Sequence, residues 1–206
     1  MSWKSTPVVR HRDPTRYQKH RLEATRAAAA VFAEKGFHGA STSDIARLLG
    51  IKQASLYYYF KSKDQALFEV CVLGIRDYVA HMEIIAATQQ PFAARLQASI
   101  SSHLSSYREN NEALKVYNDE RLYLSEEQRT ELKQQGSRYR QLLQGIFEQG
   151  VREGVLSDSI DCHFAALSVI GLCNSWGDLI VRDHAMDIFS IVHQCTELVM
   201  NGFSRK

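Results

Sequence analysis

The chain has 206 residues, 45% of them hydrophobic and 23% charged, which is ordinary for a soluble globular protein and argues against wholesale disorder. Its longest stretch without a formal charge has 16 residues, and residues 1–16 contain no apolar core segment. We therefore exclude an integral membrane protein and a signal peptide, and expect a cytoplasmic protein. Residues 1–66 carry 12 Lys and Arg against 5 Asp and Glu, whereas residues 67–206 carry 13 against 18. This asymmetry favours nucleic acid as a partner over a membrane surface.

The scarcity of helix breakers predicts an all-α protein of about nine helices. Only three prolines occur, and no alternation of apolar and polar residues is long enough for a sheet. Residues 1–16 are expected to form a flexible basic arm. A first helix over residues 17–35 follows, and Gly36 is expected to end it in a left-handed conformation.

Two short helices and a long one are expected next. Ser41 is a good N-cap for a short helix that runs to Leu49. A second short helix is predicted over residues 53–59, after the turn at Gly50, and Ser62 caps a long helix.

The second short helix has the surface that a DNA-reading helix needs. At 100° per residue, Leu56 and Phe60 face inward together. The outward residues are small or able to form hydrogen bonds, so they would not block base edges in a major groove; they are Gln53, Ala54, Ser55 and Tyr58. Arg10, Arg12 and Arg16 precede this unit and are placed to reach phosphates or the minor groove. Two short helices joined by a Gly-containing turn predict a helix-turn-helix.

The rest of the chain is predicted to be helical as well. Pro91 opens a helix to about Arg108, and a shorter one covers residues 111–123. A capping box at Ser125 starts a long helix that ends near Gly154. Asp161 caps a very apolar helix through Leu179, and residues 185–203 form the last.

Residues 17–70 carry several spaced motifs that resemble the DNA-binding domain of TetR-family transcriptional regulators. The motifs are Phe32-Ala33-Glu34-Lys35-Gly36-Phe37, Asp44-Ile45-Ala46, Gly50-Ile51 and Leu56-Tyr57-Tyr58-Tyr59-Phe60-Lys61-Ser62-Lys63. The resemblance implies a three-helix DNA-binding domain over residues 17–66 and a ligand-binding and dimerisation domain over residues 67–206. It also implies a repressor that a small apolar or amphipathic effector releases from a palindromic operator on double-stranded DNA.

The same resemblance assigns DNA contacts residue by residue. Ser43, Lys52, Gln53, Ala54, Ser55, Tyr57, Tyr58 and Tyr59 would approach bases and phosphates, and Arg16 is added from the arm. Lys63 matches the family's phosphate-gripping lysine. Lys52 departs from the family pattern, because many relatives have a small capping residue there. For Tyr57, packing against the domain is an alternative to DNA contact.

The last two helices are expected to form a homodimer interface, as they do in the family. A stripe on the final helix fits this prediction: Ile188, Ile191, Val192, Cys195, Leu198 and Val199. Ser168, Gly171 and Ser175 on the preceding helix would let two helices approach closely. The alternative is that both helices belong to an intramolecular core.

Residues 92–150 are expected to enclose a ligand cavity, because aromatic and arginine residues recur there. The candidate ligand-binding residues are Tyr107, Tyr117, Arg121, Arg138, Tyr139, Leu143, Phe147 and Trp176. The alternative to ligand binding is that most of these aromatic residues belong to the hydrophobic core. Residues 120–125, with the Arg/Gln-rich helix after them, are similar to a TetR subgroup linked to fatty-acid or steroid catabolism. That similarity makes an acyl-CoA thioester a candidate effector, with Arg121, Arg138 or Arg140 pairing with its phosphates.

No catalytic motif is present, so we expect neither an enzyme nor a cofactor. Asp183, His184 and Asp187 make a weak metal cluster and fit a polar helix start better. Four scattered cysteines without a C-x-x-C pair are expected to be buried thiols, with a redox switch as the alternative. The alternatives in function are a DNA-binding regulator without a ligand and a helical adaptor for other proteins.

Overall fold

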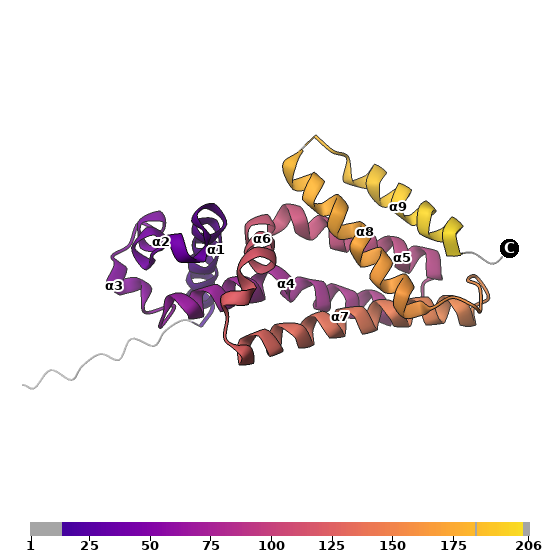
Figure 1. The fold of residues 1–206 in the computed structure, drawn as a ribbon, viewed down its shortest axis with the longest axis horizontal. Coiled ribbons are helices and arrows are strands. Elements are labelled where there is room, and N and C mark those ends of the chain that lie inside the picture. The colour runs from indigo at the N-terminus through magenta and orange to yellow at the C-terminus, as the bar shows by residue number, and fades with distance from the viewer. Residues whose placement is uncertain (1–13, 184, 204–206) are drawn as a thin grey trace, which may run out of the picture.

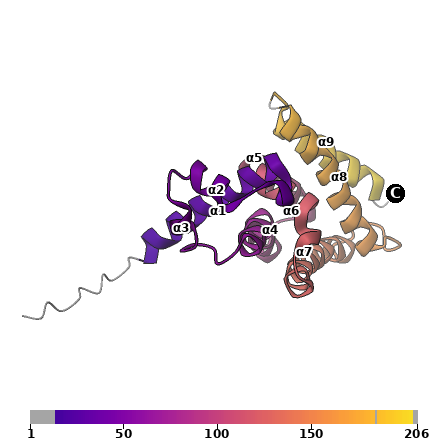
Figure 2. The same cartoon turned by 60° about the vertical axis from the view of Figure 1, so that its left-hand side comes forward.

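The computed structural model describes residues 14–183 and 185–203, and every regular element within them is a helix. The elements are α1 (Pro14–Gly39), α2 (Thr42–Leu48), α3 (Gln53–Leu56), α4 (Lys63–Ala87), α5 (Phe92–Glu109), α6 (Asn111–Glu120), the 3-10 helix η1 (Arg121–Tyr123), α7 (Glu126–Arg152), α8 (Cys162–Arg182) and α9 (Ile188–Phe203). The described part of the chain therefore has the predicted all-α class with nine α-helices. In both views α1, α2 and α3 lie at one end of the molecule, away from α8 and α9 (Figures 1 and 2).

The first helix begins earlier than expected. α1 starts at Pro14, so Arg16 lies in a helix and not in the predicted arm over residues 1–16. Proline is well suited to a helix's first turn, because its missing N–H has no intrahelical partner there. Residues 1–13, which include Arg10 and Arg12, lie outside the described residues. Gly36 has the predicted positive φ, 69°, but it kinks α1 where the sequence predicted the helix end, and a short helical stretch continues to Gly39.

The recognition segment is less helical than predicted. α3 ends at Leu56, and residues 57–59 form a turn instead of the expected helix to residue 59. The N–H groups of Tyr58 and Tyr59 bond to the carbonyls of Ser55 and Leu56, three residues back. Bonds to the third preceding residue wind the backbone more tightly than an α-helix does. Phe60, which follows this turn, is buried in the core.

α4 connects the two parts of the molecule. It packs against α1 at its N-terminal end and against α5, α6 and α7 beyond it. The predicted domain boundary between residues 66 and 67 falls inside this helix and remains a prediction. α8 covers α5 and α7, and α9 lies along α5 (Figure 1).

The predicted dimer stripe on α9 packs mostly inside the chain. Ile191, Val192, Cys195 and Val199 are buried, so for these four residues the intramolecular alternative holds. The reason is that α9 needs its most apolar face to pack on α5. Leu198 of the stripe is exposed, as are other large apolar side chains of α8 and α9; together they are Phe164, Leu167, Leu179, Phe189 and Leu198, and we call them the outer face.

α8 combines high apolarity with partial burial. Of the described helices, it is the one long and apolar enough to cross a membrane, a test that core helices of soluble proteins also pass. All four cysteines are free thiols, and Cys71, Cys173 and Cys195 are buried. Burial raises the pKa of the Cys71 thiol to about 12, which suits a packing role.

Candidate nucleic-acid interface and ligand cavity

The segment around α3 presents an open polar surface on a buried base. Leu56 and Phe60 are buried, as the helical-wheel argument predicted. Residues 52–55 are exposed, and Tyr57 and Tyr58 are half exposed. A shallow depression lies between Ala54, Ser55 and the three tyrosines. Tyr57 is about half exposed, so its side chain is accessible and its DNA contact stays a prediction beside the packing alternative.

Tyr17 joins α1 to this segment through two ring contacts. Its ring stacks on that of Tyr59, with centroids 6.3 Å apart and planes at 26°. It also meets the ring of Tyr58 edge-on at 6.1 Å. Tyr58 and Tyr59 contact each other at 5.8 Å. Since α3 has only four residues, this aromatic cluster supplies support that its own backbone bonds cannot.

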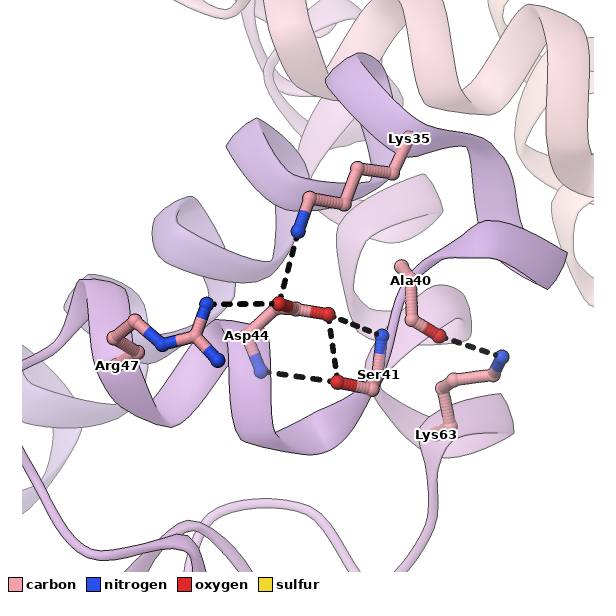
Figure 3. Close-up of polar contacts among 6 residues, drawn as sticks. All are labelled: Lys35, Ala40, Ser41, Asp44, Arg47 and Lys63. Atoms are coloured by element: carbon pink, nitrogen blue, oxygen red, sulfur yellow. Dashed lines mark hydrogen bonds and ion pairs between the residues drawn. The ribbon is translucent and has the colours of Figure 1, made fainter.

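Asp44 fixes the start of α2 (Figure 3). Its carboxylate accepts bonds from the backbone N–H of Ser41 at 3.0 Å and from the Ser41 hydroxyl at 2.6 Å, and the Asp44 N–H donates back to Ser41 Oγ. Lys35 of α1 donates to the same carboxylate at 2.9 Å, and Arg47 pairs with it at 3.2 Å. The Lys35 bond, followed by the Ser41 bonds, holds the pKa of Asp44 well below its usual range. α2 is thereby tied to α1 at neutral pH.

A cavity of about 230 Å³ lies among α4, α5, α6, α7 and α8. Its wall is largely apolar and aromatic, with one arginine and several neutral polar groups. The lining residues are Ile75, Tyr78, Val79, His103, Tyr107, Leu114, Tyr117, Asn118, Gln135, Gly136, Tyr139, Arg140, Leu167, Ile170 and Asn174. A second depression of about 470 Å³ shares Tyr107, Leu114 and Asn118 with it, and adds Lys115 and Arg182 beside Asp119 and Asp178.

A neutral hydrogen-bond network is built into the cavity wall. Tyr139 O–H donates to His103 Nδ1 at 2.8 Å, and His103 Nε2 donates to Asn174 Oδ1 at 3.0 Å. Tyr107 O–H donates to the same Oδ1 at 3.1 Å. Burial lowers the pKa of His103 to about 4, so its imidazole is neutral near pH 7. A Cβ at Gly177 would lie 2.4 Å from the Tyr107 ring, so glycine is what lets this ring lie against α8.

Two family models together cover most of the chain. Residues 24–70 match the model of the tetR family of bacterial regulatory proteins. Residues 89–202 match the tetracyclin repressor-like C-terminal domain. The chain belongs to the TetR family.

Individual TetR-family relatives agree with this assignment. The HTH-type transcriptional repressor KstR2 of Rhodococcus jostii is 30% identical over 70% of this chain and 72% of its own length. The TetR-family regulator PfmR from Thermus thermophilus superposes with a TM-score of 0.80 at 26% identity, covering 88% of this chain and 99% of that one. The regulator FadR from Bacillus subtilis, crystallised with stearoyl-CoA, has the same fold, with a TM-score of 0.73 at 23% identity over 88% and 98%.

Among the TetR-family contact positions, Lys63 makes bonds within its own chain, and its phosphate contact remains a prediction. Its ammonium donates to the carbonyl of Ala40 at 3.0 Å (Figure 3). It also donates to the carbonyl of Phe37 at 2.8 Å and lies 4.4 Å from the centre of the Phe37 ring. Two of its three N–H donors therefore tie α4 to the end of α1. Arg16, Lys52 and Arg47, the last not predicted, are exposed cations of the same domain.

The other predicted contacts lie on one surface. Ser43 is half-buried on α2, and Gln53 donates to Thr42 Oγ1 at 2.8 Å, which links α2 to α3. Ala54, Ser55, Tyr58 and Tyr59 lie in the depression described above. This placement leaves their DNA contacts as predictions.

Only part of the predicted ligand set lines the cavity. Tyr107, Tyr117 and Tyr139 do. Leu143 and Phe147 are core residues on the inner face of α7, and Trp176 lies half-buried outside the lining. Arg138 pairs with Glu83 on the surface at 3.0 Å, and Arg121 turns back to the carbonyls of Tyr117 and Asn118.

Sequence reasoning missed the polar residues of the wall, above all Tyr78, His103 and Asn174. These residues come from α4, α5 and α8, and no local pattern brings them together. In the described residues no cluster of histidine, cysteine and carboxylate side chains has the arrangement of a metal site. His184, part of the weak candidate, lies outside them.

Tyr17→Ala should weaken operator binding about three- to tenfold. An aromatic pair of this kind contributes about 0.5–1.5 kcal/mol, and its loss frees the segment after α3. Fluorescence anisotropy with operator DNA would measure the change, and the salt dependence should not move because no phosphate contact is lost. Tyr17→Phe keeps the ring and should bind like wild type. Equal weakening in both variants would contradict a role for ring stacking.

His103 should make the fold sensitive to acid. Its folded pKa of about 4 lies below its ordinary 6.5, so between these pH values the unfolded chain takes up a proton that the folded chain refuses. The contribution of neutral His103 to the free energy of unfolding is therefore complete above pH 6.5, and about 3 kcal/mol of it is lost as the pH falls through 4. Urea unfolding at pH 7 and pH 4.5 should show a smaller loss for His103→Gln. Identical losses in both proteins would rule this histidine out as the cause.

Proposed function

We propose that this TetR-family chain is a transcriptional repressor that binds a palindromic operator as a homodimer and leaves it when an amphipathic acyl-CoA-type effector fills the cavity. The observation that best supports this proposal is the position of α6 between the cavity and the DNA-binding domain. One side of this helix lines the cavity through Leu114, Tyr117 and Asn118, and another packs on α1. A ligand that moves α6 therefore acts on the DNA-binding domain.

The cavity and the depression beside it suit the two ends of such an effector. The cavity offers aliphatic and tyrosine side chains to an acyl group. The depression that shares its wall offers Lys115 and Arg182 to phosphates, although Asp119 and Asp178 limit its charge. FadR of Bacillus subtilis, a protein of the same fold, was solved with stearoyl-CoA.

The contacts between α6, η1 and α1 couple effector binding in the cavity to operator binding by the DNA-binding domain. Lys115 Nζ donates to the carbonyl of Ala33 at 2.8 Å. Tyr123 of η1 stacks on Phe37 at 5.9 Å and meets His38 edge-on at 4.4 Å. An effector that prefers a different α6 position shifts the population away from the DNA-binding arrangement. A tenfold loss of operator affinity needs a coupling free energy of only about 1.4 kcal/mol.

Tyr123→Ala should reduce this coupling and spare both binding reactions. Tyr123 lines neither cavity nor depression, so effector affinity should stay within about twofold, while effector-induced loss of operator affinity falls several-fold. Leu122→Ala is a matched control, because Leu122 is the adjacent residue of η1 and is 68% exposed against 50% for Tyr123. Calorimetry for the effector and anisotropy for the operator would separate the two effects. Normal release by Tyr123→Ala would contradict this route.

The test of the function is a titration of the DNA immediately upstream of the protein's own gene, with a scrambled duplex as control. Salt-sensitive binding that prefers the native fragment, followed by release with a series of acyl-CoA thioesters, supports the proposal. Operator binding that no acyl-CoA alters would favour a regulator without this effector. Absence of DNA binding at low salt would favour the helical adaptor.

The proposal contains no catalytic step and places the protein in the cytoplasm, where operator DNA is found. The relatives reported above are regulators by name. A thioesterase assay tests this point: incubation of the protein with acyl-CoA should release no free thiol.

A further inference from the structure

The cavity wall contains more hydrogen-bonding capacity than a plain hydrocarbon chain can use. Three neutral amides line it, Asn118 from α6, Gln135 from α7 and Asn174 from α8. Within the described residues, hydrogen bonds fix the side chain of Asn174, whereas none is formed by the side-chain amide of Asn118 or Gln135. Asn174 is therefore the amide whose orientation the protein sets in advance.

Hydrogen-bond accounting shows which atom of Asn174 is left for a ligand. Its Oδ1 accepts from both Tyr107 O–H and His103 Nε2. His103 presents that proton because its Nδ1 accepts from Tyr139 O–H. The hydroxyl protons of Tyr107 and Tyr139 are thus already committed. The amide nitrogen of Asn174 makes no bond to the described residues, and Asn174 is exposed, so this nitrogen is a fixed donor that water reaches until a ligand covers it.

We infer that Asn174 is a specificity-determining residue that donates a hydrogen bond from its amide nitrogen to a carbonyl-type oxygen of the effector inside the cavity. The inference rests on the proposed function and deepens it. The oxygen is either the thioester carbonyl or a keto oxygen on the acyl chain. Both have the same acceptor chemistry, and the ligands below distinguish them.

The size of the cavity points to short acyl groups. Its volume of about 230 Å³ is below the roughly 300–1,000 Å³ typical of drug-sized sites. A short chain brings an oxygen next to the wall, whereas a long saturated chain would cover the Asn174 amide with hydrocarbon. Sites that bind a polar group discriminate against analogues lacking it, because the protein donor is then left unpaired.

The experiment compares three matched ligands by calorimetry: hexanoyl-CoA, 5-oxohexanoyl-CoA and S-hexyl-CoA, the thioether that lacks the carbonyl. Wild-type protein should bind S-hexyl-CoA at least tenfold more weakly than the better of the two carbonyl ligands. If the thioester carbonyl is the acceptor, hexanoyl-CoA and 5-oxohexanoyl-CoA bind alike. If the keto oxygen is the acceptor, 5-oxohexanoyl-CoA binds best.

Asn174→Asp is the decisive variant, because it keeps the Oδ1 that Tyr107 and His103 need and replaces the amide nitrogen by oxygen. It should lower affinity for the preferred carbonyl ligand about tenfold and leave S-hexyl-CoA nearly unchanged. Gln135→Leu is the control, an amide of the same wall with no fixed orientation, and should not change the ranking. Thermal unfolding checks that each variant folds.

The failures of the two proposals differ. If carbonyl and thioether ligands bind wild type equally, or if Asn174→Asp weakens all three alike, the inference about Asn174 is wrong while effector binding stands. If wild-type protein binds operator DNA and none of the three ligands, the acyl-CoA effector itself is wrong, and the inference falls with it.

Discussion

Leu198→Glu should convert the protein to a monomer and lower operator affinity by about a hundredfold or more. Leu198 is 63% exposed on the outer face, to which Phe164, Leu167 and Phe189 also belong. Contiguous apolar side chains of this kind mark an interaction site, and a carboxylate buried there would lack a partner. A two-fold dimer reads two half-sites one DNA turn apart, and the loss of one half removes the roughly 10²–10⁴-fold gain from linked binding.

Ile84→Glu is the matched control for this variant. Ile84 is 67% exposed but lies on α4, whose extensive packing is with α1, α5, α6 and α7. It should remain dimeric and bind operator DNA like wild type. Analytical ultracentrifugation gives the oligomeric state, and anisotropy gives the affinity. A Leu198→Glu protein that is still a dimer would move the interface away from the outer face.

The features that the sequence predicted well depend on neighbouring residues. Ser41 and Ser125 form the predicted capping boxes, and Ser62 and Asp161 cap their helices with a bond to the third following backbone N–H. Such bonds span three residues, so the local sequence determines them. The same holds for the positive φ of Gly36, a conformation that favours glycine.

The features that it predicted poorly depend on tertiary contacts. No local pattern indicates the bonds of the Lys63 ammonium to carbonyls that lie more than twenty residues earlier in the chain, and its phosphate contact remains a prediction. The α9 stripe has a periodicity that fits a partner helix from another subunit or from its own chain, and α5 takes it. His103 and Asn174 are far apart in sequence, and only the packing of α5 on α8 joins them.

Arg95→Ala should destabilise the protein by about 3 kcal/mol or more, the largest stability effect we predict. Arg95 is 1% exposed, yet it is charged. Its Nε donates to the carbonyl of Gln90 at 2.9 Å, one NH group donates to Gln149, and the other pairs with Glu153 at 3.2 Å. The truncation removes a buried side chain together with three hydrogen bonds from a charged group, each worth about 1.5–3 kcal/mol, although Glu153 is one third exposed and regains part of its loss from water.

The surface pair of Arg138 and Glu83 provides the control. It has the same chemistry at 3.0 Å, but both side chains are about half exposed. Arg138→Ala should therefore change stability by less than about 1 kcal/mol.

In thermal unfolding at equal protein concentration, Arg95→Ala should lower the Tm by about 6–12 °C and Arg138→Ala by a few degrees at most. Arg95→Met restores most of the buried volume without the hydrogen bonds, so the difference between Met and Ala measures packing and the remaining loss measures the polar bonds. Since Arg95 fastens α5 to α7, two walls of the cavity, a similar Tm for Arg95→Ala and wild type would mean that these walls are held together by apolar contacts alone.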